Sequence, residues 1–199
     1  MLPKEVLYMP PKIKITKTDI IQKALSLIRE NGAESLNARS IAAALGCSTQ
    51  PIFSNFDTMD ALEEAVRVAA YEHYFAFLTK EAESGKYPTY KAFGMAYIRF
   101  AKEEKELFRL LFMCDRSEKE MLSVTPPDFE ASIEMIMKAN DISREKATLM
   151  HLEMWACVHG IATMLATSFL ALDWELISTM VSDVYQGTRA KHILEENKQ

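Results

Sequence analysis

Apolar residues recur at helical spacing through most of the chain, and this periodicity limits the folds that the chain can adopt. In the segment from Ile20 to Ile28, Ala24 and Leu27 complete one apolar helical face. The chain of 199 residues holds only 6 glycines and 7 prolines, too few for the turns of a many-stranded β fold. It shows neither β-type alternation nor an internal repeat. The sequence therefore predicts an all-α protein.

Capping residues and breaks divide the chain into expected helices. We expect Thr18 to cap a first helix that ends at Asn31 and Gly32. The next two short helices are expected from Asn37 to Gly46 and from Ser48 to Asn55. A longer helix is expected from Asp57 and Thr58 to about Lys80, and further helices over 89–104, 106–114, 127–140, 143–170 and 173–195.

Charge is unevenly distributed along the chain. Residues 1–56 hold seven Lys or Arg and four Asp or Glu, a net charge of +3, whereas residues 57–199 hold 16 basic and 24 acidic residues, a net charge of −8. A basic head on an acidic body is typical of a protein whose one end approaches phosphates.

Two features bear on the compartment. The three cysteines, Cys47, Cys114 and Cys157, lack metal-ligand spacing, and the first residues lack the apolar stretch of a signal peptide, so we expect reduced thiols in a cytoplasm. The 19 residues of 154–172 carry no formal charge, which is close to the length of a membrane span. They have no basic flank, however, and a helix that is apolar all round also suits a bundle centre. We expect no membrane association.

The expected helices over 37–46 and 48–55 have the geometry of a helix-turn-helix. Gly46 permits the backbone reversal between them, because glycine tolerates positive φ. In such motifs the second helix lies in the major groove of DNA.

The stretch over 15–62 resembles the DNA-binding domain of the TetR/AcrR regulators. The resemblance rests on Ile20, Ala24-Leu25, Gly32, Leu36-Asn37, Ile41-Ala42, Leu45-Gly46-Cys47-Ser48, Ile52-Phe53, Phe56 and Leu62. It implies a three-helix head, a fourth connecting helix and a helical domain for ligand binding and dimerisation. We therefore expect an arm over 1–14, a DNA-binding domain over 15–62, and a sensing and dimerisation domain over 63–199.

The resemblance assigns DNA contacts residue by residue. Thr49, Gln50 and Ser54 match positions that face base edges, and Arg39 matches a backbone-contact position. The complete expected set is Lys14, Lys17, Arg39, Ser48, Thr49, Gln50, Phe53, Ser54 and Asn55. Phe53 stands where the family usually has a tyrosine that bonds a phosphate, and Met59 stands where it has a lysine. The two departures bear on affinity for DNA, since phosphate contacts dominate that affinity.

The second part of the chain is rich in methionine and aromatic residues, a mixture that suits an adaptable apolar pocket as well as plain core packing. We expect a small-molecule site lined by Phe93, Tyr97, Phe112, Met135 and Trp155. The segment from Trp155 to Ala162, with His159 and Gly160, resembles a Trp…His-Gly signature of one TetR subgroup. His151 and His159 are expected to be core or interface residues, with no metal and no cofactor bound.

The predicted function is a ligand-responsive transcriptional regulator, most simply a repressor that a mainly hydrophobic molecule releases from a palindromic operator. It is expected to act as a homodimer that pairs through 143–170 and 173–195, an interface that Leu165→Glu would break. An enzyme is the first alternative, but the sequence has no phosphate loop, nucleophile elbow or HExxH motif. A helical interaction module is the second, which would not explain the matched helix-turn-helix. The operator, the effector, the regulated genes and the choice between repression and activation stay open.

Overall fold

The computed structural model describes residues 15–114 and 127–196, which form nine α-helices and one short 3-10 helix. The first helices are α1 (Lys17–Asn31), η1 (Ala33–Ser35), α2 (Ala38–Ala44), α3 (Gln50–Asn55) and α4 (Met59–Ala82). The others are α5 (Thr89–Glu103), α6 (Lys105–Phe112), α7 (Pro127–Asn140), α8 (Arg144–Ala166) and α9 (Trp174–Glu196). No strand occurs in these ranges, so the all-α prediction is confirmed.

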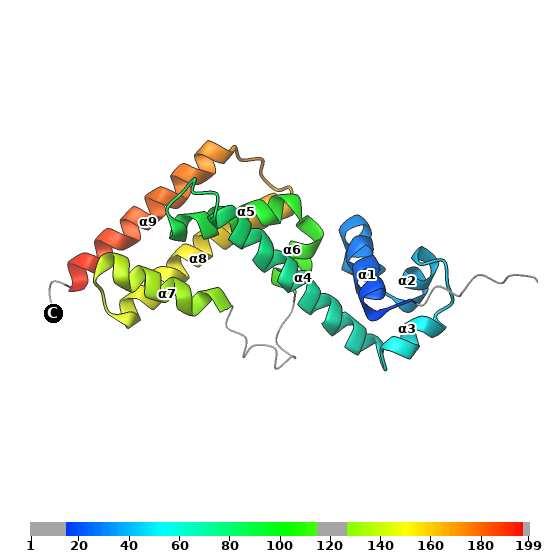
Figure 1. The fold of residues 1–199 in the computed structure, drawn as a ribbon. Helices are drawn as coiled ribbons and strands as arrows, with labels where there is room; N and C mark the ends of the chain where they lie inside the picture. Colours follow the sequence, from blue (N-terminus) through cyan, green and yellow to red (C-terminus); the bar gives the residue numbers. More distant parts are fainter. Residues whose placement is uncertain (1–14, 115–126, 197–199) are drawn as a thin grey trace, which may run out of the picture.

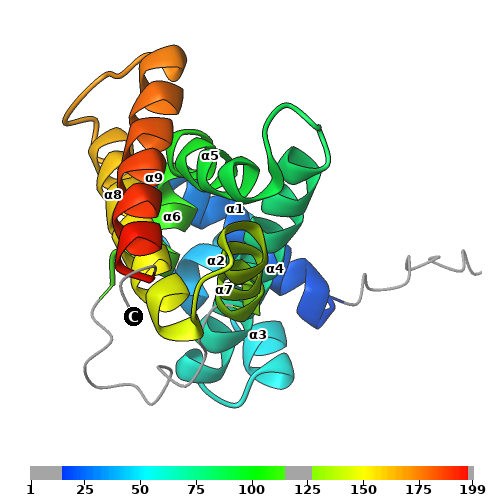
Figure 2. The ribbon, with the colours of Figure 1, turned by 90° about the vertical axis from the view of Figure 1, so that its left-hand side faces the viewer.

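The helices form a small head and a larger body. Helices α1, α2 and α3 gather at one end of the molecule, and α5, α7, α8 and α9 form the other end (Figure 1). Helix α4 runs from the head into the body, with α6 beside it. Seen along the long direction of the molecule, α5, α8 and α9 lie together on one side of the body (Figure 2). The body helices α5 and α8 pack against each other, α7 and α9 both pack on α8, and α4 packs on α5.

Helix α1 begins two residues earlier than expected. Its N-cap is Thr16, whose side chain accepts a hydrogen bond from the backbone N–H of Asp19. The Asp19 carboxylate accepts one in return from the Thr16 backbone N–H, at 2.8 Å. This reciprocal capping box satisfies two backbone donors, so the prediction of a cap at Thr18 was wrong. The expected end of the helix agrees with the structure, because Gly32 is the C-cap with φ 82°.

The turn between α2 and α3 depends on Gly46, which has φ 66° as expected. Asn37 caps α2 by accepting a hydrogen bond from the Ser40 backbone N–H at 2.9 Å. The third helix was expected to begin at a Ser48 cap, and this was wrong. Its first bonds run from Ile52 and Phe53 to the Thr49 carbonyl, so α3 begins at Gln50.

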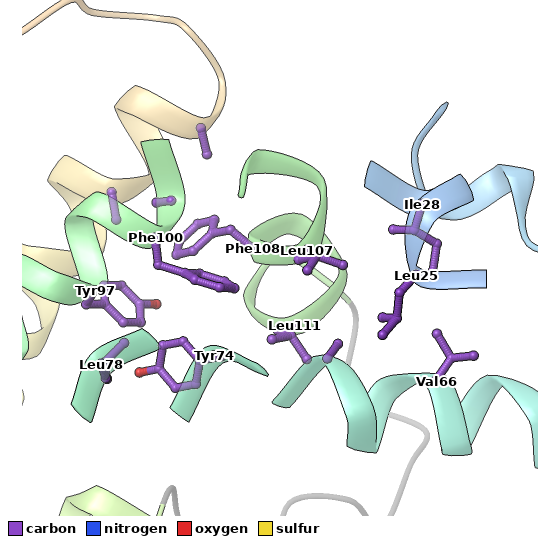
Figure 3. Close-up of a cluster of buried hydrophobic side chains, with 14 of the residues drawn as sticks. Leu25, Ile28, Val66, Tyr74, Leu78, Tyr97, Phe100, Leu107, Phe108 and Leu111 are labelled. Carbon is purple, nitrogen blue, oxygen red and sulfur yellow. The ribbon is translucent and has the colours of Figure 1, made fainter. Parts of the chain in front are cut away.

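One hydrophobic core extends from the head through the body. Leu25 and Ile28 of α1 face Leu107 and Leu111 of α6, and Phe108 continues the cluster into the body (Figure 3). The α6 side chains in this cluster are buried, and α1 also packs directly on α4. The head is therefore attached to the body by apolar packing on both α4 and α6.

A carboxylate at the junction of α5 and α6 adds a polar link between head and body. Glu104 accepts a hydrogen bond from Arg29 Nε of α1 at 2.8 Å, and its other oxygen lies 2.9 Å from His73 Nε2 of α4. Burial of Glu104 opposes its ionisation, but the bonds from Arg29 and His73 prevail and lower its pKa. The ionised carboxylate thus joins three helices.

Helix α8 is the centre of the body. Its length and its apolar composition would be enough for a helix that crosses a membrane, but the core helices of soluble proteins meet the same two criteria. It packs against α5, α7 and α9, and its buried residues include Met154, Ile161 and Leu165. Leu165 is only 6% exposed and belongs to the monomer's own core. Leu165→Glu would therefore disturb folding, and it is not the probe of dimerisation that the sequence suggested.

Candidate functional site

The exposed face of α3 is the first candidate site. Gln50, Phe53 and Ser54 are exposed, and Phe53 retains 50% of its accessible surface. The opposite face is held in the head by Ile52, which is fully buried, and by Phe56 just after the helix. The Ser54 hydroxyl donates to the Gln50 carbonyl at 2.9 Å, which leaves its oxygen able to accept. Three of the expected DNA-contacting side chains therefore share one accessible surface.

Three further expected residues lie at the two ends of α3. Ser48 is exposed and Thr49 is half-buried at the N-terminal end, where Thr49 makes no side-chain cap bond. Asn55 is half-buried at the other end, and its amide donates to the carbonyls of Pro51 at 2.7 Å and Ile15 at 3.4 Å. The structure thus uses the Asn55 donors to hold the chain that enters α1.

The basic residues expected at DNA lie around this face or outside the described residues. Arg39 at the start of α2 is exposed, and it forms no ion pair with any of the described residues. Lys17 is exposed at the start of α1, with Nζ 5.2 Å from the centre of the Phe56 ring. Lys14 lies outside the described residues. The head therefore presents at least two cations beside an exposed short helix, which is an arrangement able to meet phosphates.

The second candidate site is a cavity in the body, with a volume of about 1390 Å³. Its wall is formed by side chains from α4, α5, α7, α8 and α9 and by residues at the end of α6. Aromatic rings make up much of it: the Tyr74 and Tyr97 rings lie 5.0 and 5.2 Å from the ring of Phe112, centre to centre. A cavity lined mainly by aromatic and apolar groups suits a sizeable, largely apolar ligand.

The cavity opens to the surface beside α4 and α8. Val68 and Phe75 of α4 and Trp155 of α8 line it, and they are 49%, 42% and 48% exposed. Exposed large apolar side chains that line one opening form the kind of apolar patch that marks a binding site. A ligand entering here would cover them.

Four of the five residues expected at the ligand site line this cavity: Phe93, Tyr97, Phe112 and Trp155. Met135 does not line it. Phe129 and Ser132 are the α7 residues in the wall, and Met135 lies one helical turn further along, half-buried. Sequence alone could not tell which turn of α7 reaches the cavity.

A phenol–imidazole pair lies in the wall between α5 and α8. The Tyr90 hydroxyl is 2.9 Å from His151 Nδ1. Burial raises the pKa of Tyr90, to which nearby Tyr185 adds, and burial lowers the pKa of His151. Both groups are therefore uncharged at neutral pH. They provide hydrogen-bonding capacity without charge.

Lys91, in the first turn of α5, supplies a cation to the same wall. Its Nζ lies 2.8 Å from Ser178 Oγ and 2.7 Å from Ser182 Oγ, both on α9. Lys91, Ser182 and Tyr90 were not among the site residues that the sequence predicted. One signal was available: a lysine in the first turn of a helix is unfavourable beside the helix dipole, which marks it as a residue with another role.

The two histidines of α8 have separate environments. His151 pairs with Tyr90, whereas His159 Nδ1 lies 2.8 Å from the Tyr97 hydroxyl and its ring stacks on Trp155 at 5.1 Å. Over residues 15–114 and 127–196, no group of three or more His, Cys, Asp or Glu side chains is placed to hold a metal ion.

The fold and the two sites define a class: an all-helical protein with a helix-turn-helix head and a cavity in its helical body. Solved structures share this fold. A protein of unknown function from Rhodococcus sp. RHA1 is 18% identical with a TM-score of 0.68, and the alignment covers 96% of this chain and 99% of that one. A putative transcriptional regulator from Pseudomonas aeruginosa PAO1 is 15% identical with a TM-score of 0.68, covering 90% and 93%. A TetR family member from Streptomyces coelicolor A3 is 17% identical with a TM-score of 0.61, covering 84% and 96%.

The sequence of the body matches a family as well. Residues 90–182 match the model of the tetracyclin repressor-like C-terminal domain. No curated protein matches the sequence. The body therefore resembles the C-terminal domain of tetracyclin repressor-like proteins in sequence, and the whole chain shares its fold with the solved structures.

Proposed function

We propose that this protein is a cytoplasmic TetR-type repressor that binds a palindromic operator as a homodimer and leaves it when a largely apolar molecule fills the body cavity. The observation that carries the proposal is the combination, in one chain, of an exposed helix-turn-helix and a large aromatic cavity whose wall includes α4. Helix α4 also packs against the head.

DNA recognition is assigned to α3. Gln50 is exposed at its first turn, where a glutamine amide has the geometry to pair with adenine N6 and N7 in the major groove. Thr49 and Ser54 would complete the base-facing set. Arg39 and Lys17 would contact phosphates, which position the helix without reading sequence.

Dimerisation is assigned to the outer faces of α8 and α9. On α8, Leu149 is exposed, and on α9 Leu176 and Leu194 are exposed. A Cβ added at Gly187 of α9 would meet no atom within 4 Å, so the surface of the monomer beside this glycine is open. Exposed leucines around such a gap suit the close approach of a second copy, and a two-fold axis would pair α8 and α9 with their own copies.

Release from DNA follows from the place of α4. Val68, Tyr71 and Tyr74 line the cavity from one face of α4, and the same helix begins directly after α3. A ligand that prefers a shifted α4 would move the head and change the spacing of the two α3 helices in the dimer. Coupling of this kind is typically about 1–3 kcal/mol, or 5–150-fold in affinity.

We also place the body in the TetR subgroup with a Trp…His-Gly signature. In support, the Trp155 and His159 rings stack with only 16° between their planes, and His159 also meets the Tyr97 hydroxyl. Tyr97 and Trp155, which line the cavity, would then be held in place by His159 as a preassembled unit.

The DNA part of the proposal is tested by footprinting on the DNA upstream of the protein's own reading frame. The wild type is expected to protect a palindromic site, and Gln50→Ala is expected to lose about 1–3 kcal/mol of discrimination against other DNA. Gln22→Ala, an exposed glutamine on α1, is the matched control. Protection that does not depend on sequence would refute the assignment.

The ligand part is tested with the neutral fluorophore N-phenyl-1-naphthylamine. Its fluorescence is expected to rise on binding the wild type, and saturation is expected to weaken operator binding. Val68→Trp fills the cavity from an exposed position and should abolish both responses without changing operator affinity; Lys80→Trp on the same helix should change neither. If the Val68 variant binds the fluorophore as tightly as the wild type, the ligand site lies elsewhere.

A further inference from the structure

The charged groups of the cavity are unevenly placed. The carboxylates in its wall are Glu64 and Glu72, both exposed on α4. The cation Lys91 is also in the wall but on α5, where its Nζ bonds Ser182 of α9, and it is half-buried. In the described part of the chain no carboxylate forms an ion pair with Lys91. The part of the wall formed by α5 and α9 therefore carries a cation that has no counter-ion among the described residues.

Three contacts hold the Lys91 ammonium in place. Ser178 Oγ and Ser182 Oγ lie 2.8 and 2.7 Å from Nζ, and the Tyr87 ring centre lies 4.9 Å away. The Ser182 hydroxyl donates its own proton to the Ser178 carbonyl at 3.0 Å, so its oxygen is free to accept from Lys91. The side chain is thus oriented by neutral groups, which fix its position without cancelling its charge.

A partly buried cation without an anion is costly, and its place in the first turn of α5 adds to that cost. An anionic group bound beside Nζ would remove both disadvantages. Ser182, which also lines the cavity, holds the ammonium at this point of the wall, because its oxygen accepts a hydrogen bond from Nζ. The rest of the wall offers aromatic surface for an apolar body.

We propose that the effector is an amphipathic anion, an acid with a long or aromatic apolar body, whose charged group binds the Lys91 ammonium while its body lies among the aromatic side chains of the cavity. This inference rests on the proposed function, because it names the chemistry of the ligand for the same cavity. Arg67 is the other cation in the wall, but it already donates to the Leu110 carbonyl at 3.0 Å and lies on α4 between the two carboxylates.

The test compares an acid with its neutral analogue. Decanoate and decan-1-ol are each titrated against N-phenyl-1-naphthylamine bound to the full-length protein. In the wild type we expect decanoate to displace the fluorophore at lower concentration than decan-1-ol. Lys91→Met, which keeps the length of the side chain without the charge, is expected to weaken decanoate by about tenfold or more and decan-1-ol by less than twofold. Ser182→Ala should weaken decanoate to a smaller degree.

Two further variants make the outcome specific. Lys86→Met removes a lysine whose Nζ lies 5.4 Å from the same Tyr87 ring but which does not line the cavity, and it should change neither affinity. Loss of decanoate binding in Arg67→Met but not in Lys91→Met would overturn the proposal. So would failure of decanoate to displace the fluorophore, or equal binding of the acid and the alcohol in every variant.

These experiments test the proposed ligand class and the proposed regulatory function separately. If decan-1-ol binds as well as decanoate and the fluorophore still releases the operator, the ligand class is wrong and the regulatory role stands. If decanoate binding depends on Lys91 while no cavity ligand changes operator affinity, the anionic site stands and ligand-controlled release does not.

Discussion

Phe53 is half-exposed on α3, and its ring carries no group able to bond a phosphate oxygen. Its neighbours on the same surface, Gln50 and Ser54, carry polar groups. In the proposed DNA complex, a phenylalanine here would contribute apolar contact but no side-chain hydrogen bond. In the proposed complex, base reading would therefore fall to α3, and phosphate binding to Arg39 of α2 and Lys17 of α1.

Phe53→Tyr is expected to strengthen binding to operator and to unrelated DNA by the same factor, about fivefold, because the added hydroxyl reaches a phosphate, and one hydrogen bond contributes about 1 kcal/mol. Fluorescence anisotropy with both DNA duplexes measures the two affinities. Phe75→Tyr, at an equally exposed phenylalanine of α4, is the control and should leave both unchanged. A gain confined to the operator would contradict the assignment of this position to the backbone.

The junction between head and body combines ion pairs with apolar packing. Helices α1, α4 and α6 meet where Arg29 and His73 bond the Glu104 carboxylate. The apolar contacts of Leu107 and Leu111 lie in the same region (Figure 3). A shift of α4 driven from the cavity would therefore act on this junction before it reached α3.

The Glu104 carboxylate should stabilise the fold in a pH-dependent way. Burial opposes ionisation, but the hydrogen bonds of Arg29 and His73 lower its pKa, so its stabilisation is complete above the unfolded-state value of about 4.3 and is lost as pH falls through the lower folded-state value. Glu104→Gln is expected to reduce the free energy of unfolding by about 1–2 kcal/mol at pH 7 and by much less at pH 3.

Urea unfolding at both pH values measures the difference, with Glu103→Gln as the control. Glu103 is the exposed neighbour at the end of α5, and its replacement should have little effect at either pH. An equal loss at pH 7 and pH 3 would show that Glu104 acts by packing and not by charge.

At the scale of the whole molecule, exposed leucines lie along one face of α9, and the proposed dimer would use this face. Leu176, Gly187 and Leu194 are exposed, and their spacing along α9 places them on one face. Ala190 and Asp183 share this face. A second copy would cover the leucines, and Gly187 would allow the helices to approach closely.

Gly187→Arg is expected to convert the dimer into a monomer, because the new side chain would occupy the space between the two copies. The monomer itself should fold, since a Cβ at this position meets no atom within 4 Å. Light scattering after size exclusion measures the mass, and circular dichroism checks the helix content. Ser84→Arg, at an exposed site after α4, is the control. An unchanged dimer would place the interface elsewhere.

Local rules were enough to predict the helices and several of their ends. Asn37 caps α2 and Gly32 and Gly46 close their turns, because capping depends on residues within one turn of the chain. The same rules missed the Thr16 cap. In its capping box the third helical residue is Asp19, whereas a glutamate or glutamine is usual at that position. The apolar face of α1 also followed from spacing alone.

The sequence by itself therefore determined the order of the helices, the helix-turn-helix and the aromatic character of the body. The tertiary structure decided which turns meet: it left Met135 outside the cavity wall, buried Leu165 in the monomer, and brought Lys91 to Ser182 across 91 positions of sequence. Periodicity defines which residues share a face of one helix, but the rotation and crossing of one helix against another arise from packing between distant segments.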